Sequence, residues 1–225
     1  MTNWGPKIRS FFQFQRGILF QYGWLKAWWA GRPVDAKGEP LPWITYPAID
    51  FLTQFDFSDS RVFEWGSGFS TLWWSGRCKQ ITSVESNLSW IPYIRTMLPE
   101  QVELLTPEFS AEAEVAALAQ HPTERFDVIV IDNNGPFRHH CAAAAPARLA
   151  LGGMIILDNS DQCLAATAVL RREGFTQIDF TGYVPGLGYP HTTSFFFKQQ
   201  LNFRTLRDYQ PERSIAQPNP PWENC

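Results

Sequence analysis

Two groups of residues in this chain have the types and the spacing to do chemistry together. The first is a glycine-rich turn that follows a short apolar run, within the stretch Arg61 to Glu85. A backbone without Cβ can turn sharply out of a strand and lie close against a ligand. The second is a set of polar side chains that end two later apolar runs, Asp132 and the pair Asp158 and Asn159. The sequence therefore predicts a ligand site built from a tight turn and from acidic side chains.

The sequence predicts secondary structure on both sides of the turn that would hold it in position. A strand is predicted from Arg61 to Trp65, a turn from Gly66 to Gly68, a helix from Phe69 to Gly76, and a second strand from Gln80 to Val84. Glu85 ends that second strand, where a carboxylate can accept both hydroxyls of a ribose. The turn lacks the third glycine of the GxGxxG fingerprint, which disfavours an NAD-dependent oxidoreductase. An ordinary glycine-rich turn between a strand and a helix is the alternative.

The string E-W-G-S-G, from Glu64 to Gly68, resembles motif I (E/D-x-G-x-G) of the class I S-adenosylmethionine-dependent methyltransferases. The strings FEWGSGFSTLWW, GGMIILDNSD and HTTSFFFK are similar to a broad group of bacterial class I methyltransferase-like proteins. The resemblance implies S-adenosyl-L-methionine as cofactor, with its sulfonium near the aromatic faces of Trp65 or Phe69. In that family the turn faces the amino acid part of the cofactor. The cofactor residues implied here are Glu64, Gly66, Ser67, Gly68, Ser70, Glu85 and Asp132.

The rest of the chain continues the alternation of strands and helices. Further strands are predicted at 102–105, 126–131, 154–157, 176–180 and 192–198, and helices at 46–55, 88–98, 111–120, 138–150 and 162–173. Together with the resemblance, this predicts an α/β fold, a Rossmann-like, doubly wound sheet of seven mostly parallel strands in the order 3-2-1-4-5-7-6, with the last strand antiparallel. We expect an aromatic helical extension and linker over 1–58, a methyltransferase domain over 59–200 and a tail over 201–225.

The polar side chains at the strand ends suggest a metal. Ligands in such a sheet bind beyond the carboxyl ends of the strands, so Asp132, Asp158 and Asn159 are expected side by side. Two carboxylates and an amide oxygen suit Mg²⁺, and a resemblance to the catechol O-methyltransferase group implies the same three ligands. No lysine stands near Asp132 as a base, so catalysis is assigned to Asp132 and His139, with His140 as an alternative. The alternative for Asp158 and Asn159 is a turn that caps the next helix.

Composition limits the acceptor and the partners. A hydrophobic content of 44% is enough for a full core, and a net charge of −3 gives no global attraction to nucleic acid. The four cysteines are widely spaced without a CxxC pair, which predicts reduced thiols in a cytoplasmic protein. We therefore expect O-methylation of a small molecule or glycan, with no nucleic-acid partner. The alternative is a noncatalytic scaffold or membrane-associated protein of the same fold.

The N-terminal segment, residues 1–34, carries five basic and no acidic side chains and is crowded with Phe and Trp. Its apolar residues recur at helical spacing and give one apolar face. The longest charge-free run, Gly17 to Leu25, is too short to span a bilayer. Residues 7–30 are thus expected to contact either protein, as a helix packed on the domain or on a second subunit, or a membrane surface. Phe14 and Phe20 on the other faces favour packing against protein.

Overall fold

The computed structural model describes residues 4–121, 123, 125–207 and 215. The helices are α1 (Trp4–Gln15), a π-helical segment (Arg16–Gln21), α2 (Trp24–Ala30), α3 (Tyr46–Leu52), α4 (Phe69–Ser75), α5 (Ile91–Arg95), α6 (Ala111–Ala119), α7 (Arg138–Ala144) and α8 (Leu164–Arg172), with short 3-10 helices at Gly135–Phe137 and Ala145–Arg148. The strands are β1 (Phe55–Asp56), β2 (Arg61–Trp65), β3 (Gln80–Val84), β4 (Glu103–Leu105), β5 (Phe126–Ile131), β6 (Leu149–Leu157), β7 (Thr176–Tyr183), β8 (Pro190–Phe197) and β9 (Arg204–Thr205). Of the predicted tail over 201–225, residues 208–214 and 216–225 lie outside the described residues.

The main sheet has seven strands in the order β4-β3-β2-β5-β6-β8-β7. Counted from β2, this is the predicted order 3-2-1-4-5-7-6. Strands β2 to β6 pair in parallel, and β8 is antiparallel to both β6 and β7. The predicted doubly wound fold with an antiparallel last strand is therefore confirmed. The short strands β1 and β9, which were not predicted, pair with each other outside this sheet.

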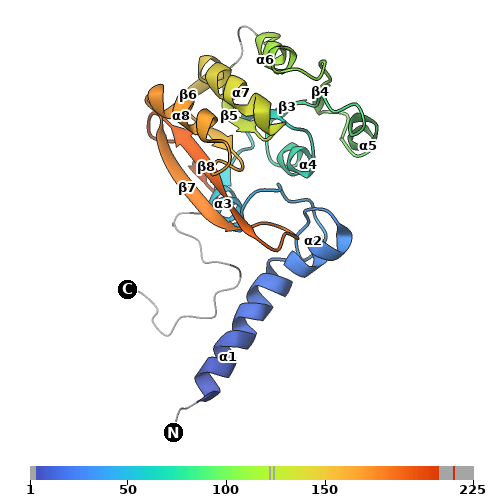
Figure 1. Cartoon of the computed structure of the whole chain (residues 1–225), viewed down its shortest axis with the longest axis vertical. Coiled ribbons are helices and arrows are strands. Elements are labelled where there is room, and N and C mark those ends of the chain that lie inside the picture. Colours follow the sequence, from blue (N-terminus) through green and yellow to red (C-terminus); the bar gives the residue numbers. More distant parts are fainter. Residues whose placement is uncertain (1–3, 122, 124, 208–214, 216–225) are drawn as a thin grey trace.

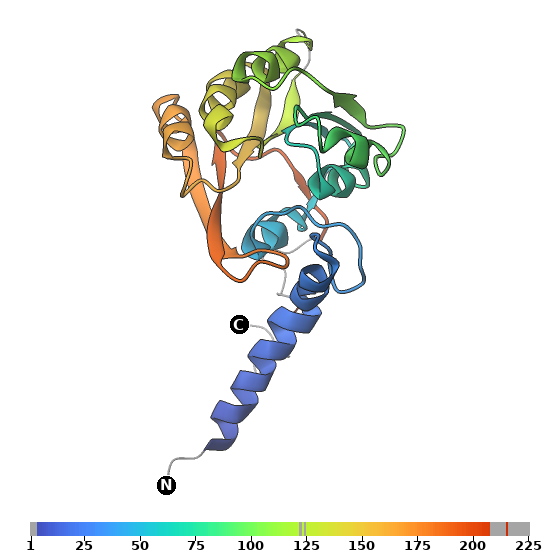
Figure 2. The same ribbon diagram turned by 45° about the vertical axis from the view of Figure 1, so that its right-hand side comes forward.

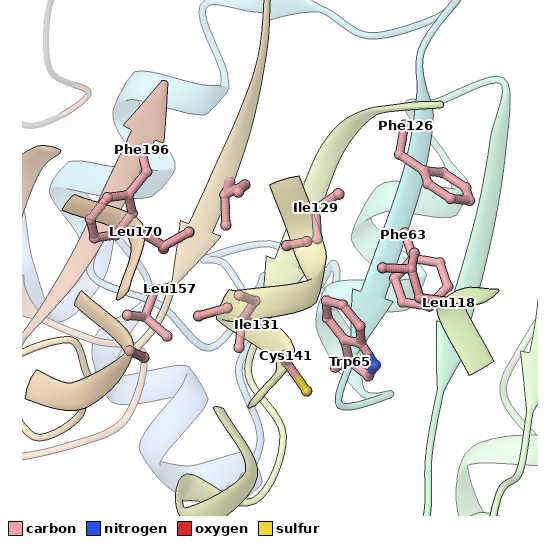
Figure 3. Close-up of a cluster of buried hydrophobic side chains, with 14 of the residues drawn as sticks. Phe63, Trp65, Leu118, Phe126, Ile129, Ile131, Cys141, Leu157, Leu170 and Phe196 are labelled. Carbon is pink, nitrogen blue, oxygen red and sulfur yellow. The ribbon is translucent and has the colours of Figure 1, made fainter. Parts of the chain in front are cut away.

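The central strands form because their side chains are buried on both faces of the sheet. Along β2, Phe63 and Trp65 point to one face and Val62 to the other, and none of the three is exposed. Such strands appear in a sequence as continuous apolar runs. The first face is covered by α6, α7 and α8, and Figure 3 shows Leu118 and Leu170 packed in this cluster with the strand residues.

The second face is covered by elements that come earlier in the chain. Ile49 and Leu52 of α3 and the paired indoles of Trp73 and Trp74 on α4 pack there, and both indoles are 1% exposed. Figure 1 shows α3 and α4 on the side of the sheet away from α6 and α7. The sheet is thus the middle layer of three, and its carboxyl edge stays open between the two helical layers.

Several predicted elements begin or end at other residues in the structure. The predicted helix over 138–150 stops at Ala144 and becomes a 3-10 turn, because Pro146 cannot continue an α-helix. The predicted helix over 88–98 shortens to Ile91–Arg95. The predicted turn-rich stretch from Gly182 to His191 is shorter in the structure, because β7 continues to Tyr183 and β8 begins at Pro190, which leaves residues 184–189 as the loop of a hairpin.

Helix α1 projects away from the layered domain, as Figures 1 and 2 show from two directions. The side chains of residues 5–14 are all exposed. From the sequence we favoured packing of this segment against protein, either its own domain or a second subunit. Packing on its own domain is wrong for α1. None of the helices in the described residues combines the length and the apolar content that a membrane crossing needs.

Candidate functional site

The chain turns sharply between β2 and α4. Gly66 has φ +101°, and a Cβ there would lie 2.4 Å from the carbonyl oxygen of Asp132, so only glycine suits this position. Gly68 differs, because its φ of −169° is extended and a Cβ there would meet nothing within 4 Å. The Gly68 N–H donates to Thr71 Oγ1 at 2.9 Å. The first glycine thus presses the turn against the end of β5, and the second leaves its outer side open.

Glu64 supports this turn from within β2. Its side chain is fully buried, and Oε2 accepts hydrogen bonds from Thr71 Oγ1 at 2.5 Å and Ser83 Oγ at 2.8 Å. Ser67 Oγ lies 2.6 Å from the same Ser83 hydroxyl. Oε1 of Glu64 has no hydrogen-bond partner among the described residues. Glu64 therefore holds the shape of the turn, and its side chain does not line the cavity that lies above it.

Burial raises the pKa of Glu64 to about 7 from an ordinary 4.5, against the opposing effect of its hydroxyl donors. The folded-state pKa of Glu64 lies above the unfolded value, so its protonated form contributes to the free energy of unfolding. This contribution is complete below pH 4.5 and is lost as pH rises through about 7. Glu64→Gln cannot ionise, so between about pH 5 and about pH 8 it should gain on the order of 2 to 3 kcal/mol in unfolding free energy relative to the unmodified protein.

Urea unfolding at the two pH values measures this difference. Glu112→Gln is the matched control, because Glu112 is exposed on the first turn of α6. If the difference in unfolding free energy between Glu64→Gln and the unmodified protein is the same at both pH values, the raised pKa of Glu64 is contradicted.

A cavity of about 660 Å³ lies at the carboxyl edge of β2, β3 and β5. It is lined by the predicted residues Gly66, Ser67, Gly68, Ser70, Glu85 and Asp132. Glu85 is half-buried, and one of its oxygens accepts from the Asn87 N–H at 2.7 Å. Trp90 and Tyr93 form an aromatic wall with ring centroids 4.8 Å apart, and Trp90 Nε1 donates to the Ser67 carbonyl at 2.7 Å. The cavity has the size and the mixed apolar and polar lining of a small-molecule site.

Sequence reasoning missed a buried polar cluster on the cavity floor. Glu114 of α6 is 2% exposed and accepts from Ser86 Oγ and from Asn133 Nδ2. All three residues line the cavity. Trp65 donates its indole N–H to the Glu114 carbonyl at 2.9 Å and is fully buried, so of the two aromatic residues expected near a sulfonium only Phe69 lines the cavity. No local signal marks Glu114, because it stands in an alanine-rich helix.

Another part of the cavity lining, apart from the aromatic wall of Trp90 and Tyr93, comes from the N-terminal segment. Residues 31–33 and Trp43 line the cavity, and the Arg32 guanidinium lies 5.7 Å from the Phe69 ring centroid. Trp43 Nε1 donates to the Pro185 carbonyl at 3.0 Å, which ties this wall to the loop between β7 and β8. Neither Arg32 nor Trp43 was predicted from the sequence to belong to the site.

Arg138 brings together the three residues predicted to hold a metal. The residue is 7% exposed, and its Nη2 lies 2.8 Å from Asp132 Oδ1. Its Nη1 donates to the Asp158 carbonyl oxygen at 2.5 Å and to Asn159 Oδ1 at 3.1 Å. Burial raises the pKa of Asp132 to about 7, against the lowering by Arg138. A guanidinium therefore stands where a divalent cation was expected.

The Asp158 carboxylate is also occupied by protein groups. Its Oδ1 accepts from Thr193 Oγ1 at 2.6 Å and lies 3.3 Å from His191 Nε2. Burial lowers the pKa of His191, but its contact with Asp158 and the nearby carboxylates outweigh burial and raise the pKa overall. His191 reaches this edge because β8 is antiparallel and so begins beside the end of β6.

These contacts do not fit the predicted magnesium site. The three proposed ligands are Asp132, Asp158 and Asn159. Their side chains face Arg138, His191 and the Thr193 hydroxyl of the protein itself. Among the described residues, no group of three or more His, Cys, Asp or Glu side chains could hold a metal ion. The magnesium prediction is therefore not supported.

The predicted base His139 lies apart from the cavity at the turn. It lines a separate hollow between the start of α7 and the start of α8, together with Asn159 and Cys163. Its ring faces that of His140, with centroids 3.8 Å apart. Of the two residues assigned to catalysis, the structure thus brings only Asp132 to the cavity.

No protein-family model matches this sequence, and no curated protein matches it. Solved structures match through the fold. The cofactor-bound protein Rv0187 from MTB has a TM-score of 0.57 and 17% identity, with 89% of this chain and 100% of that chain covered. A precorrin-6y C5,15-methyltransferase from Geobacter metallireducens has a TM-score of 0.55 and 18% identity, with 68% and 87% covered.

A further similar structure, a candidate methyltransferase from Streptococcus mutans in complex with SAH, has a TM-score of 0.51 and 15% identity, with 68% of this chain and 98% of that chain covered. At such identities the likeness establishes the fold alone. The chain has the Rossmann-like fold of class I methyltransferases.

Proposed function

We propose that this protein is an S-adenosylmethionine-dependent methyltransferase that methylates an oxygen of a small molecule or sugar. The observation that carries the proposal is the single cavity in which the open turn at Gly68, the Glu85 carboxylate and the aromatic wall meet. Its place at the carboxyl edge of parallel strands is where such sheets bind ligands. Solved structures with this fold include one bound to SAH and one described as cofactor-bound, which supports the choice of cofactor.

The residues of the cavity fit this cofactor. Glu85 stands at the end of β3, where its carboxylate can accept ribose hydroxyls. The open side of Gly68 leaves room for the amino acid part, and the faces of Phe69 and Trp90 suit a sulfonium and an adenine ring. When bound, the cofactor supplies an electrophilic methyl group. The cavity walls exclude water from that group and orient the acceptor.

Asp132 is the candidate general base. It lines the cavity, and a pKa of about 7 suits a group that must gain and lose a proton near neutral pH. Asp132 would take the proton of the acceptor hydroxyl as that oxygen becomes methylated. Arg138 holds the carboxylate in place through Oδ1. The acceptor would lie between Asp132 and the wall of Arg32 and Trp43, which also line the cavity.

Isothermal titration calorimetry tests the proposal directly. The full chain should bind S-adenosylmethionine and S-adenosylhomocysteine at roughly −8 kcal/mol, in the micromolar range, and should give no saturable heat with NAD. Chelation of divalent ions should leave both affinities unchanged, because Arg138 stands at the expected metal position. Binding of NAD, or no binding of either sulfur compound, would contradict the proposal. The second result would favour a noncatalytic protein of the same fold.

A further inference from the structure

The N-terminal arm, residues 4–30, has a surface that the proposed methyl transfer does not use. Its first helix, α1, leaves the domain in both views of the molecule (Figures 1 and 2). Phe11, Phe12 and Phe14 are 58%, 62% and 63% exposed. Large aromatic side chains gathered on one protruding element are characteristic of a binding surface, because leaving them in water is costly.

The arm has an apolar side with basic side chains at its edge. With about 3.6 residues per turn, Ile8, Phe11 and Phe12 of α1 fall on one side of the helix. Arg9 and Arg16 stand three residues before and four residues after Phe12, so they lie beside it at the edge of that apolar side. Long basic side chains can bend toward the boundary of an apolar face and keep their charges in a polar layer. This arrangement is that of a helix lying in an interface between apolar and polar media.

The base of the arm is held by the domain. Trp24 Nε1 donates to the Leu187 carbonyl at 2.8 Å. A Cβ at Gly186 would lie 2.9 Å from the Trp28 backbone nitrogen, so the loop between β7 and β8 lies tightly against α2. Trp28 and Trp29 nevertheless stay 55% and 84% exposed. Exposed aromatic side chains therefore lie also on α2, an element that the domain anchors, and indole rings suit the boundary between lipid and water.

Charge indicates what the arm binds. Residues 1–34 carry five basic and no acidic side chains, whereas the rest of the chain carries 14 basic and 22 acidic ones. An anionic surface would attract the arm and repel the body, which orients the molecule with the arm toward the surface. Pairing of two arms in a symmetric dimer would instead bring like charges together.

We propose that the arm docks this protein on an anionic lipid surface. Ile8, Phe11 and Phe12 enter the headgroup region, and Arg9 and Arg16 contact lipid phosphates. The inference does not depend on the cofactor, since none of these residues lines the cavity.

Sedimentation with lipid vesicles tests the proposal on the full chain. Vesicles of phosphatidylcholine alone are compared with vesicles that contain about 30 mol % phosphatidylglycerol, at low and high salt. The unmodified protein should bind the anionic vesicles at least about 10-fold more tightly than the neutral ones, and high salt should weaken the binding. Phe11→Ser with Phe12→Ser, and separately Arg9→Glu with Arg16→Glu, should each lower the partition coefficient at least about 10-fold.

Two matched controls separate docking from general surface effects. Leu88→Ser with Leu151→Ser removes exposed apolar side chains elsewhere, and Arg171→Glu with Arg172→Glu reverses exposed charges on α8; both should bind as the unmodified protein does. Absence of binding to anionic vesicles would overturn the proposal, as would equal binding to neutral ones. A dimer in light scattering that Phe11→Ser with Phe12→Ser dissociates, without vesicle binding, would overturn it in favour of a second copy. S-adenosylhomocysteine affinity should be unchanged in every arm variant.

Discussion

Gly68→Asp is expected to abolish binding of S-adenosylmethionine and S-adenosylhomocysteine while the fold is retained. The backbone at Gly68 is extended and its missing Cβ faces open space, so the new side chain causes neither strain nor a clash within the protein. The added carboxylate would enter the cavity beside the turn, where the resemblance places the amino acid part of the cofactor, which carries a carboxylate. Lost space and like-charge repulsion should weaken binding at least about 100-fold, equivalent to about 2.8 kcal/mol.

Calorimetry with S-adenosylhomocysteine measures this loss, and circular dichroism with thermal melting checks the fold. Gly188→Asp is the matched control, because Gly188 is equally open at its Cβ but does not line the cavity. It should bind as the unmodified protein does. Equal affinities for Gly68→Asp and Gly188→Asp would place the cofactor elsewhere.

Asp132→Asn is expected to remove methyl transfer while cofactor binding persists. Asparagine keeps an oxygen that can accept from Arg138, so the local geometry is preserved, but it cannot take a proton from an acceptor hydroxyl. Loss of a general base typically costs about 10² to 10⁴ in rate. Cofactor affinity should change by less than about 10-fold, because Asp132 forms only part of the cavity lining.

Transfer of labelled methyl groups to a panel of hydroxyl-bearing small molecules and sugars gives this measurement. With an acceptor found on the unmodified protein, the rate should rise with pH through about 7, since Asp132 must be ionised to act as a base. Asp132→Asn should lose that rise together with most of the rate. Asp127→Asn, at the other end of β5, is the control and should keep both. An unchanged rate in Asp132→Asn would exclude Asp132 as the base.

The arm and the N-terminal wall of the cavity are adjacent in the sequence. Helix α2 ends at Ala30, and residues 31–33 already form part of the cavity wall. The same loop between β7 and β8 accepts a hydrogen bond from Trp24 and one from Trp43. Docking of the arm on lipid would therefore hold the N-terminal wall of the cavity close to the membrane surface.

The sequence by itself was sufficient for the fold and for the turn. Strands β2, β3 and β5 have the predicted bounds, because strands buried on both faces are continuous apolar runs with sharp polar or glycine ends. The turn at Gly66 was predictable because its requirement is local: the backbone takes a positive φ that only glycine adopts easily. The position of Glu85 directly after β3 was predictable from the same short-range pattern.

Only the tertiary structure decided which groups these carboxylates face. Asp132 and Asp158 follow different strands as predicted, but whether a metal or a side chain lies near them depends on Arg138, which the sequence analysis had given no role. The antiparallel direction of β8 was predicted, but only the structure shows that His191, at the start of that strand, lies beside Asp158. Glu114 reaches the cavity floor from a helix with no distinguishing pattern. Local periodicity sets where strands and turns form, whereas the partners of a buried charge come from segments distant in sequence, so only the packed fold determines them.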